Sequence, residues 1–374
     1  MRRKGEKYCS VSVAVVLFIL LLLQGGVADA QVKAQVLRLK NERSFSLILL
    51  PDVQNYVKYD YNQPVLELMT AWVKDNIKNL NIKAALCTGD LVDQNECIRP
   101  PYPRFGNLTS REQWNFVSHA FERLDNRIPY IICTGNHDYG YTRSEYPRTE
   151  YPKYFTVERN NKLPDILVGD YPNRMNERSL ENSAFVISDE SMVKGWSKLM
   201  VINIEYGARN EVLEWAHNLA VSEDYKDYKV IVLTHAYLGA GDNAPRIGRG
   251  GYKMQPINGG EDIWQKLVKI TPNIKLVICG HVATPDEKFE SAAGFRTDKN
   301  DAGNTVVQMM FNTQAIGGGM SGNGGDGWLR ILEFMPDGKT VDVVTYSPLF
   351  GFSARTKDIA IEESACNKFS FKLE

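Results

Sequence analysis

The sequence contains little that would mark a specialised class of protein. Six cysteines in 374 residues are too few to hold a chain of this size together by disulfides. Basic residues are not in excess, with 44 Lys and Arg against 45 Asp and Glu, so the net charge indicates no nucleic-acid partner. Internal repeats, long Pro/Ser-rich linkers and charge blocks are also missing. A hydrophobic fraction of 43% is typical of an ordinary globular protein.

The N-terminal segment has the order of features found in targeting signals. A basic start is followed by an apolar run from Val11 to Leu23 and by the small residues Ala28 and Ala30. This order is typical of a secretory signal peptide, and the run is shorter than the ~20 residues that a spanning helix needs. We expect residues 1–30 to be a signal peptide and the protein to be secreted or periplasmic, with no stable membrane span after the signal is removed. An uncleaved anchor is the alternative.

The rest of the chain alternates between strand-like and helical patterns. Short apolar runs occur at residues 45–50, 82–87, 130–133, 199–204, 230–233 and 274–279, and amphipathic helical spacing occurs near 65–80, 114–124, 212–219 and 263–270. Near-continuous apolarity predicts strands covered on both faces, and the alternation predicts an α/β fold with parallel strands. The runs at 305–311, 328–334 and 341–346 have no helices between them. The turn at 336–338 predicts an antiparallel hairpin between the last two.

Polar residues able to bind metals follow five of these runs. They are Asp52, Asp90, the triplet Asn136-His137-Asp138, His235 and His281. In α/β proteins the ligand-binding site lies beyond the carboxyl ends of the parallel strands, which share one edge of the sheet. We therefore expect these side chains to lie close together at that edge. Each has an ordinary alternative when taken singly: Asp90 as a helix cap, Asn136 as a turn residue, His235 as a core histidine.

Together these motifs resemble the calcineurin-like metallophosphoesterases. The resemblance is carried in order by Asp52-x-Gln54, Gly89-Asp90-x-x-Asp93, Gly135-Asn136-His137-Asp138, Thr234-His235 and Gly280-His281. It implies a four-layer α/β/β/α sandwich over residues 31–374 as a single domain, followed in our expectation by the C-terminal hairpin. It also implies two divalent metal ions (Mn, Fe, Zn or Mg) and hydrolysis of a phosphomonoester or phosphodiester by a metal-activated hydroxide.

The resemblance also implies a role for each site residue. Asp90 would bridge the metals, and Asp52 would hold the first. Asn136, His235 and His281 would hold the second. His137 would stabilise or protonate the leaving oxygen, and Asp138 would orient His137. The substrate would be a small molecule or a phosphoprotein.

Two positions depart from the commonest family pattern. Gln54 stands where the first motif usually has a histidine, and this Asp-x-Gln form resembles a branch of the family. Ala283 stands where the last motif, Gly-His-x-His, usually has its second histidine. Both losses weaken the first metal site and favour harder ions such as Mn²⁺ or Mg²⁺. Asp286 is a possible replacement ligand. A metal-depleted relative that binds a ligand without hydrolysing it is therefore the alternative function.

Three further expectations concern loops and cysteines. Residues 143–182 are polar and their apolar residues show neither helical nor strand periodicity. This pattern predicts a long insertion beside the site. A Gly-rich stretch follows Gln314, and the resemblance to the Asp-x-Gln branch predicts that Gln314 and Asp326 lie near the metals. Cys97 and Cys366 lie in polar surroundings, where a disulfide between them is possible.

Overall fold

Short apolar runs that end in polar clusters form the strands of two sheets. The structure, a computed structural model, describes residues 37–100, 102–187 and 192–374, and the predicted signal peptide lies outside them. The first sheet has the order β14-β13-β12-β1-β2-β3, with β15 also pairing β13. Its strands are β1 (Phe45–Leu50), β2 (Ile82–Cys87), β3 (Tyr130–Ile132), β12 (Leu329–Phe334), β13 (Thr340–Tyr346), β14 (Ile361–Glu362) and β15 (Lys368–Lys372).

The second sheet has the order β4-β5-β6-β7-β9-β11-β10-β8. Its strands are β4 (Leu167–Asp170), β5 (Ser183–Val186), β6 (Leu199–Asn203), β7 (Lys229–Leu233), β8 (Gly241–Asp242), β9 (Ile274–Cys279), β10 (Ala293–Lys299) and β11 (Thr305–Phe311). Strands β6, β7, β9 and β11 run parallel, as do β1, β2 and β3. The carboxyl ends of each parallel set therefore meet at one edge of its sheet.

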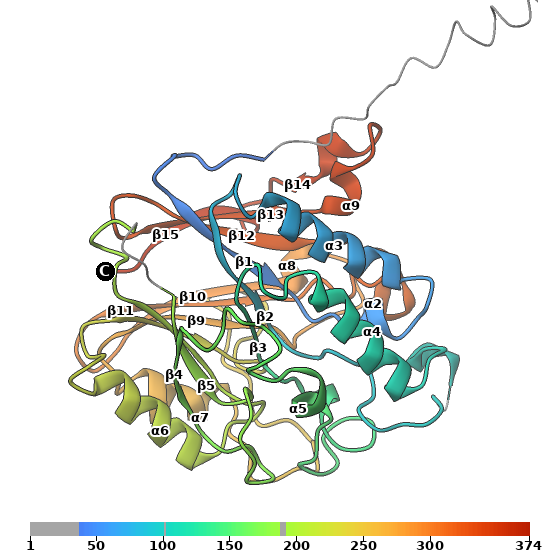
Figure 1. Cartoon of the computed structure of the whole chain (residues 1–374), viewed down its shortest axis with the longest axis horizontal. Helices are drawn as coiled ribbons and strands as arrows, with labels where there is room; N and C mark the ends of the chain where they lie inside the picture. The colour runs from blue at the N-terminus through green and yellow to red at the C-terminus, as the bar shows by residue number, and fades with distance from the viewer. Residues whose placement is uncertain (1–36, 101, 188–191) are drawn as a thin grey trace, which may run out of the picture.

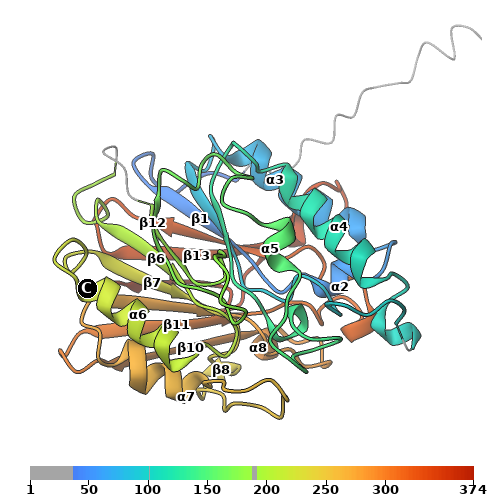
Figure 2. The same ribbon diagram turned by 60° about the horizontal axis from the view of Figure 1, so that its bottom comes forward.

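Helices cover the outer faces of both sheets, so the α/β sandwich expected from the sequence is confirmed. Figure 1 shows α3 (Gln63–Asn76) and α4 (Ser110–Glu122) on one side, with α6 (Asn210–Val221) and α7 (Gly260–Ile263) on the opposite side. Figure 2 shows the same layers after a turn of the molecule. The remaining helices are single turns: α2 (Gln54–Val57), α5 (Tyr151–Tyr154), α8 (Phe289–Ala292) and α9 (Pro348–Gly351).

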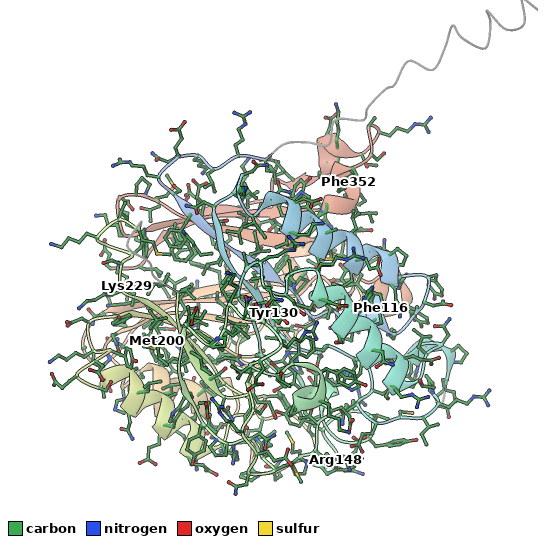
Figure 3. All side chains as sticks on the ribbon, viewed as in Figure 1. Phe116, Tyr130, Arg148, Met200, Lys229 and Phe352 are labelled. Atoms are coloured by element: carbon green, nitrogen blue, oxygen red, sulfur yellow. The ribbon has the colours of Figure 1, made fainter. Side chains whose placement is uncertain are left out.

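Two large apolar clusters hold the layers together. One includes Leu47, Leu86 and Ile278, and so joins the facing sides of the two sheets. The other includes Met200 of the second sheet, labelled in Figure 3, and the buried face of α6. Each fully buried aliphatic side chain contributes roughly 1.5–3 kcal/mol, so these layers form a rigid frame for the residues at the strand ends.

The chain after β9 is richer in strands than the sequence pattern indicates. The hairpin of β12 and β13 is confirmed and is antiparallel. However, β10 pairs with β11 and β15 pairs with β13, and neither β10 nor β15 was predicted. Both strands carry alternating charged residues on partly exposed faces, which hides them from a search for apolar runs. In the described residues, no helix has the length and apolarity needed to cross a membrane.

The segment at 143–182, expected as a long insertion beside the site, contains regular structure of its own. This segment contains α5 and β4, and β4 pairs antiparallel with β5 at the edge of the second sheet. All four residues of β4 are only half-buried, so the strand lacks the apolar run that marks a buried one. The segment also touches the strand-end residues, because Ser144 Oγ donates to the backbone oxygen of Asn136 at 2.8 Å.

Candidate metal centre

The five strand-end positions converge around one buried histidine. His235 Nε2 lies 3.4 Å from Asp90 Oδ2, 3.1 Å from Asn136 Oδ1 and 3.1 Å from His281 Nδ1, while His235 Nδ1 lies 3.8 Å from Asp52 Oδ1. One ligand atom from each of Asp52, Asp90 and His235 lies within 4.8 Å of the others. The predicted convergence of these residues is therefore found in the structure. They come from β1, β2, β3, β7 and β9, which belong to both sheets.

Glycines allow this close approach. A Cβ on Gly135 would lie 2.1 Å from Asp90 Oδ1, and a Cβ on Gly280 would lie 2.1 Å from Asp52 Oδ1. Asp90 and His281 themselves have positive φ angles of 48° and 71°, which non-glycine residues rarely adopt. Such backbone strain is typical of functional sites, where the surrounding structure holds it in place.

The two central carboxylates have little to neutralise them. Within the described chain, His235 is the cationic group within 4 Å of Asp52 and of Asp90. Burial raises the pKa of Asp52 to about 7; nearby His235 opposes this rise and Asp90 adds to it. Burial alone would raise the pKa of Asp90 as well, but His235 and His137 outweigh it and hold that pKa below the usual range.

The imidazoles respond to the same charges. Burial would lower the pKa of His235, but Asp90 and Asp52 outweigh it and raise the pKa to about 9. Burial lowers the pKa of His281 to about 3, with His235 adding to the effect. Two buried carboxylates held by one shared imidazole are an electrostatic environment that favours an added cation.

An unpaired amide oxygen beside the carboxylates, that of Gln54, supports the same conclusion. Gln54 Nε2 donates to Asp90 Oδ2 at 2.9 Å, and Gln54 Oε1 is buried without a hydrogen-bond partner. The side-chain oxygens of Asn55 and Gln314 are also buried and unpaired. Leaving such atoms unsatisfied costs free energy, and a hard divalent cation would satisfy them. The residues present therefore fit divalent metal ions.

The structure corrects the expected role of Asp138 as the partner of His137. The Asp138 carboxylate accepts hydrogen bonds from the backbone N–H groups of Gly135, Leu91 and Val92. His137 Nδ1 instead lies 2.7 Å from the backbone oxygen of Asp93 and 3.9 Å from Asp93 Oδ1. Asp93, three residues after Asp90, is therefore the residue that His137 contacts.

Asp93 is in turn held by a buried lysine. Lys58 Nζ lies 3.6 Å from Asp93 Oδ1, and both side chains are almost fully buried. Burial lowers the pKa of Lys58, and the carboxylate of Asp93 opposes this shift. Asp93 lies within the quoted Gly-Asp-x-x-Asp motif, so a sequence signal for it existed. Lys58 carries no such signal.

Asn312 opens the stretch Asn312-Thr313-Gln314, which resembles the closing segment of the Asp-x-Gln branch, but the sequence assigned Asn312 itself no role. It follows β11, and its Nδ2 donates to Asp52 Oδ2 at 2.6 Å, while its Oδ1 accepts from the backbone N–H of Gln314 at 3.1 Å. The backbone of Gln314 is thus linked to Asp52 through Asn312, and the nearness of Gln314 and Asp326 to the metals stays a prediction. Asp326 pairs with Asn323 inside the Gly-rich turn.

Asp286 is turned to other partners. Its carboxylate accepts from Thr284, Ser291 and the backbone of Lys288 at the surface, so the structure does not place it as the replacement ligand. Cys97 and Cys366 are free thiols, and the possible disulfide between them is not formed.

Comparison with known proteins identifies the class to which this fold and centre belong. The family model for calcineurin-like phosphoesterases matches residues 48–285, so the chain belongs to that family. A curated relative, the uncharacterized protein YvnB of Bacillus subtilis (strain 168), is 28% identical over 331 residues. The match covers 88% of this chain but 21% of the relative, so the chain spans about a fifth of that protein's length.

A solved structure with a similar outline is GAP50, described as the anchor in the inner membrane complex of Plasmodium. Its TM-score is 0.40 and its sequence identity 12%, covering 88% of this chain and 89% of that one.

Proposed function

We propose that this protein hydrolyses a phosphomonoester or phosphodiester with the help of two divalent metal ions, with Mn, Fe, Zn and Mg as candidates. The observation that carries the proposal is the meeting of Asp52, Asp90 and His235 from three separate strands, with ligand atoms within 4.8 Å. Such ions activate water and neutralise charge on the phosphoryl oxygens. Asp90 is the proposed bridge, because the resemblance to the family assigns that role to the aspartate of the Gly-Asp motif and its carboxylate is within reach of both Asp52 and His235.

The surrounding residues divide into two halves. Asn136, His235 and His281 are the proposed holders of one ion, and Asp52 with the amide oxygen of Gln54 the proposed holders of the other. Asn312 fixes the orientation of Asp52 through its hydrogen bond. This arrangement leaves one half rich in nitrogen ligands and the other rich in oxygen ligands.

His137 is the proposed proton donor to the leaving oxygen. Its Nδ1–H donates to the backbone oxygen of Asp93, which fixes the tautomer and leaves Nε2 free to exchange a proton. Its backbone N–H donates to Asp90 Oδ1 at 2.9 Å and thereby ties the imidazole to the centre. General acid catalysis of this kind raises the reaction rate by roughly 10²–10⁴-fold.

Metal content and turnover together test this function. The purified protein should bind two equivalents of metal and hydrolyse a chromogenic phosphate ester when Mn²⁺ is added. The second candidate, a relative that binds a ligand without hydrolysing it, is favoured by Ala283 in place of a ligand histidine. Bound metal with no turnover on either monoesters or diesters would support that candidate and contradict hydrolysis.

We also propose that the protein is exported, because the N-terminal pattern is that of a signal peptide. N-terminal sequencing of the protein recovered from outside the cytoplasm should find Gln31 as its first residue. Recovery of the full-length chain in the cytoplasm would contradict export. The natural ester is a separate question, best approached by screening monoesters and diesters with several metals.

A further inference from the structure

A buried arginine stands apart from the metal centre. Arg330 of β12 is 1% exposed, and within the described chain no carboxylate lies within ion-pair distance of its guanidinium. By contrast, the buried Lys58 has Asp93, and the buried side chain of Arg174 has Glu205. An uncompensated buried charge is rare, because removing it from water is costly.

The guanidinium is held in place by neutral groups. Nε donates to Thr345 Oγ1 at 3.2 Å, and Nη2 donates to the Cys366 backbone oxygen at 2.7 Å and to Asn367 Oδ1 at 3.2 Å. In the part of the chain that the structure describes, Nη1 forms no hydrogen bond. The charge also lies over the rings of Phe311 and Phe369, at 4.3 Å and 5.6 Å from their centroids. These contacts orient the guanidinium without neutralising it.

Arg330 lines a cavity of about 430 Å³. The walls come from the edges of both sheets, namely β8 and β10 of the second and β15 with the preceding loop of the first. None of the strand-end residues of the metal centre lines it. Small residues, including Gly294, Ala293 and Ala365, leave the space open, while Phe295 and Phe369 give it an aromatic surface. Its volume is within the roughly 300–1,000 Å³ of small-molecule sites.

We propose that this cavity binds a small organic monocarboxylate with an apolar or aromatic body, whose carboxylate pairs with Arg330. The planar guanidinium offers donors in the geometry that a carboxylate accepts, and the apolar walls cover the rest of the ligand. Two exposed acids, Asp242 and Glu290, also line the cavity. They repel a second negative charge, which favours a monoanion over a phosphate or dicarboxylate.

Binding of defined probes to the full-length, metal-loaded protein tests this site. The probes are 3-phenylpropionate and octanoate, with 3-phenylpropanamide as the neutral analogue, measured by titration calorimetry. Inorganic phosphate is added to occupy the metal centre, so that carboxylate binding to the metals does not contribute. We expect saturable binding of both carboxylates and none of the amide. Arg330→Met should weaken binding roughly tenfold or more, because a buried charge pair loses one partner.

Two further variants make the result decisive. Ala365→Trp changes an exposed residue of the cavity wall and leaves Arg330 intact, so it should abolish binding by filling the space even if Arg330→Met fails to fold. Arg296→Met on β10 removes an arginine that pairs with Asp298 and does not line the cavity, so it should leave binding unchanged. Four results would each overturn the proposal: no saturable binding to the wild type, equal binding of the amide, binding that survives Ala365→Trp, or binding that phosphate abolishes.

Discussion

Gly280 gives the sharpest test of the geometry of the centre. Its φ is not positive, so alanine is allowed by the backbone and the effect of Gly280→Ala is steric. The new Cβ would lie 2.1 Å from Asp52 Oδ1 and 2.6 Å from Thr88 Oγ1, whereas real Cβ contacts begin at 3.0 Å. The Asp52 carboxylate must therefore move by about 1 Å, and a misplacement of that size costs ~10²-fold in rate. This corresponds to ~2.7 kcal/mol in the activation barrier.

The assay compares hydrolysis of a chromogenic ester with Mn²⁺, metal content and thermal unfolding. Gly280→Ala should lower kcat by about a hundredfold and reduce bound metal, while the protein stays folded. Gly251→Ala is the matched control, because its Cβ meets nothing within 4 Å and its φ is also not positive. Wild-type kcat and metal content in Gly280→Ala would refute the assignment of Asp52 to the centre.

Three other predictions concern single side chains. Asp90→Asn removes the proposed bridging charge and should abolish turnover; full activity in this variant cannot be reconciled with the mechanism. His137→Ala should lower kcat about 10²–10⁴-fold with metal content unchanged, and a parallel loss of metal would instead place His137 among the metal-holding groups. Burial raises the pKa of Glu181 from 4.5 to about 7, with neighbouring Glu205 adding to the rise and a hydrogen bond from Tyr139 opposing it. The folded state then binds more protons than the unfolded chain between these pH values, so Glu181 lowers stability as pH rises from about 4.5 to about 7, by ~3 kcal/mol at most. Urea unfolding at several pH values measures how steeply the free energy of unfolding falls with pH. This fall should be smaller in Glu181→Gln, and an equal fall in the variant and the wild type would contradict the raised pKa of Glu181.

The residues at the strand ends could be predicted because two signals coincide there. Apolar runs mark the buried strands, and the first polar residues after them must lie at the sheet edge, as Asp52, Asp90 and His235 do. The partner of His137 could not be predicted in the same way. Asp138 is unavailable to the imidazole because its carboxylate accepts hydrogen bonds from three backbone N–H groups, and the loop after β2 brings Asp93 to His137 instead. No pattern of residue types in the sequence indicates these backbone contacts.

Asn312 shows the same limit over a longer range. It lies 260 residues from Asp52 along the chain, and it follows β11 of the second sheet whereas Asp52 follows β1 of the first, so the two meet only because the sheets pack together. The stretch Asn312-Thr313-Gln314 resembles the closing segment of the Asp-x-Gln branch, but nothing in it indicates that Asn312 contacts Asp52. Edge strands were missed for a related reason: β15 alternates exposed lysines with partly buried aromatics, and its short run resembles a polar tail.

The two halves of the proposed centre differ in their chemistry, and this difference has a consequence for metal choice. His235, His281 and Asn136 give one half two imidazoles. The other half has Asp52 and the buried, unpaired oxygen of Gln54. Oxygen ligands suit Mn²⁺ and Mg²⁺, whereas imidazoles suit Zn²⁺ and Fe²⁺. If the proposed centre holds metals, Ala283 in place of a histidine leaves the first half with oxygen ligands, so we expect that half to prefer Mn²⁺ or Mg²⁺. Metal analysis of the purified protein would test this: Zn²⁺ or Fe²⁺ filling both halves equally would contradict it.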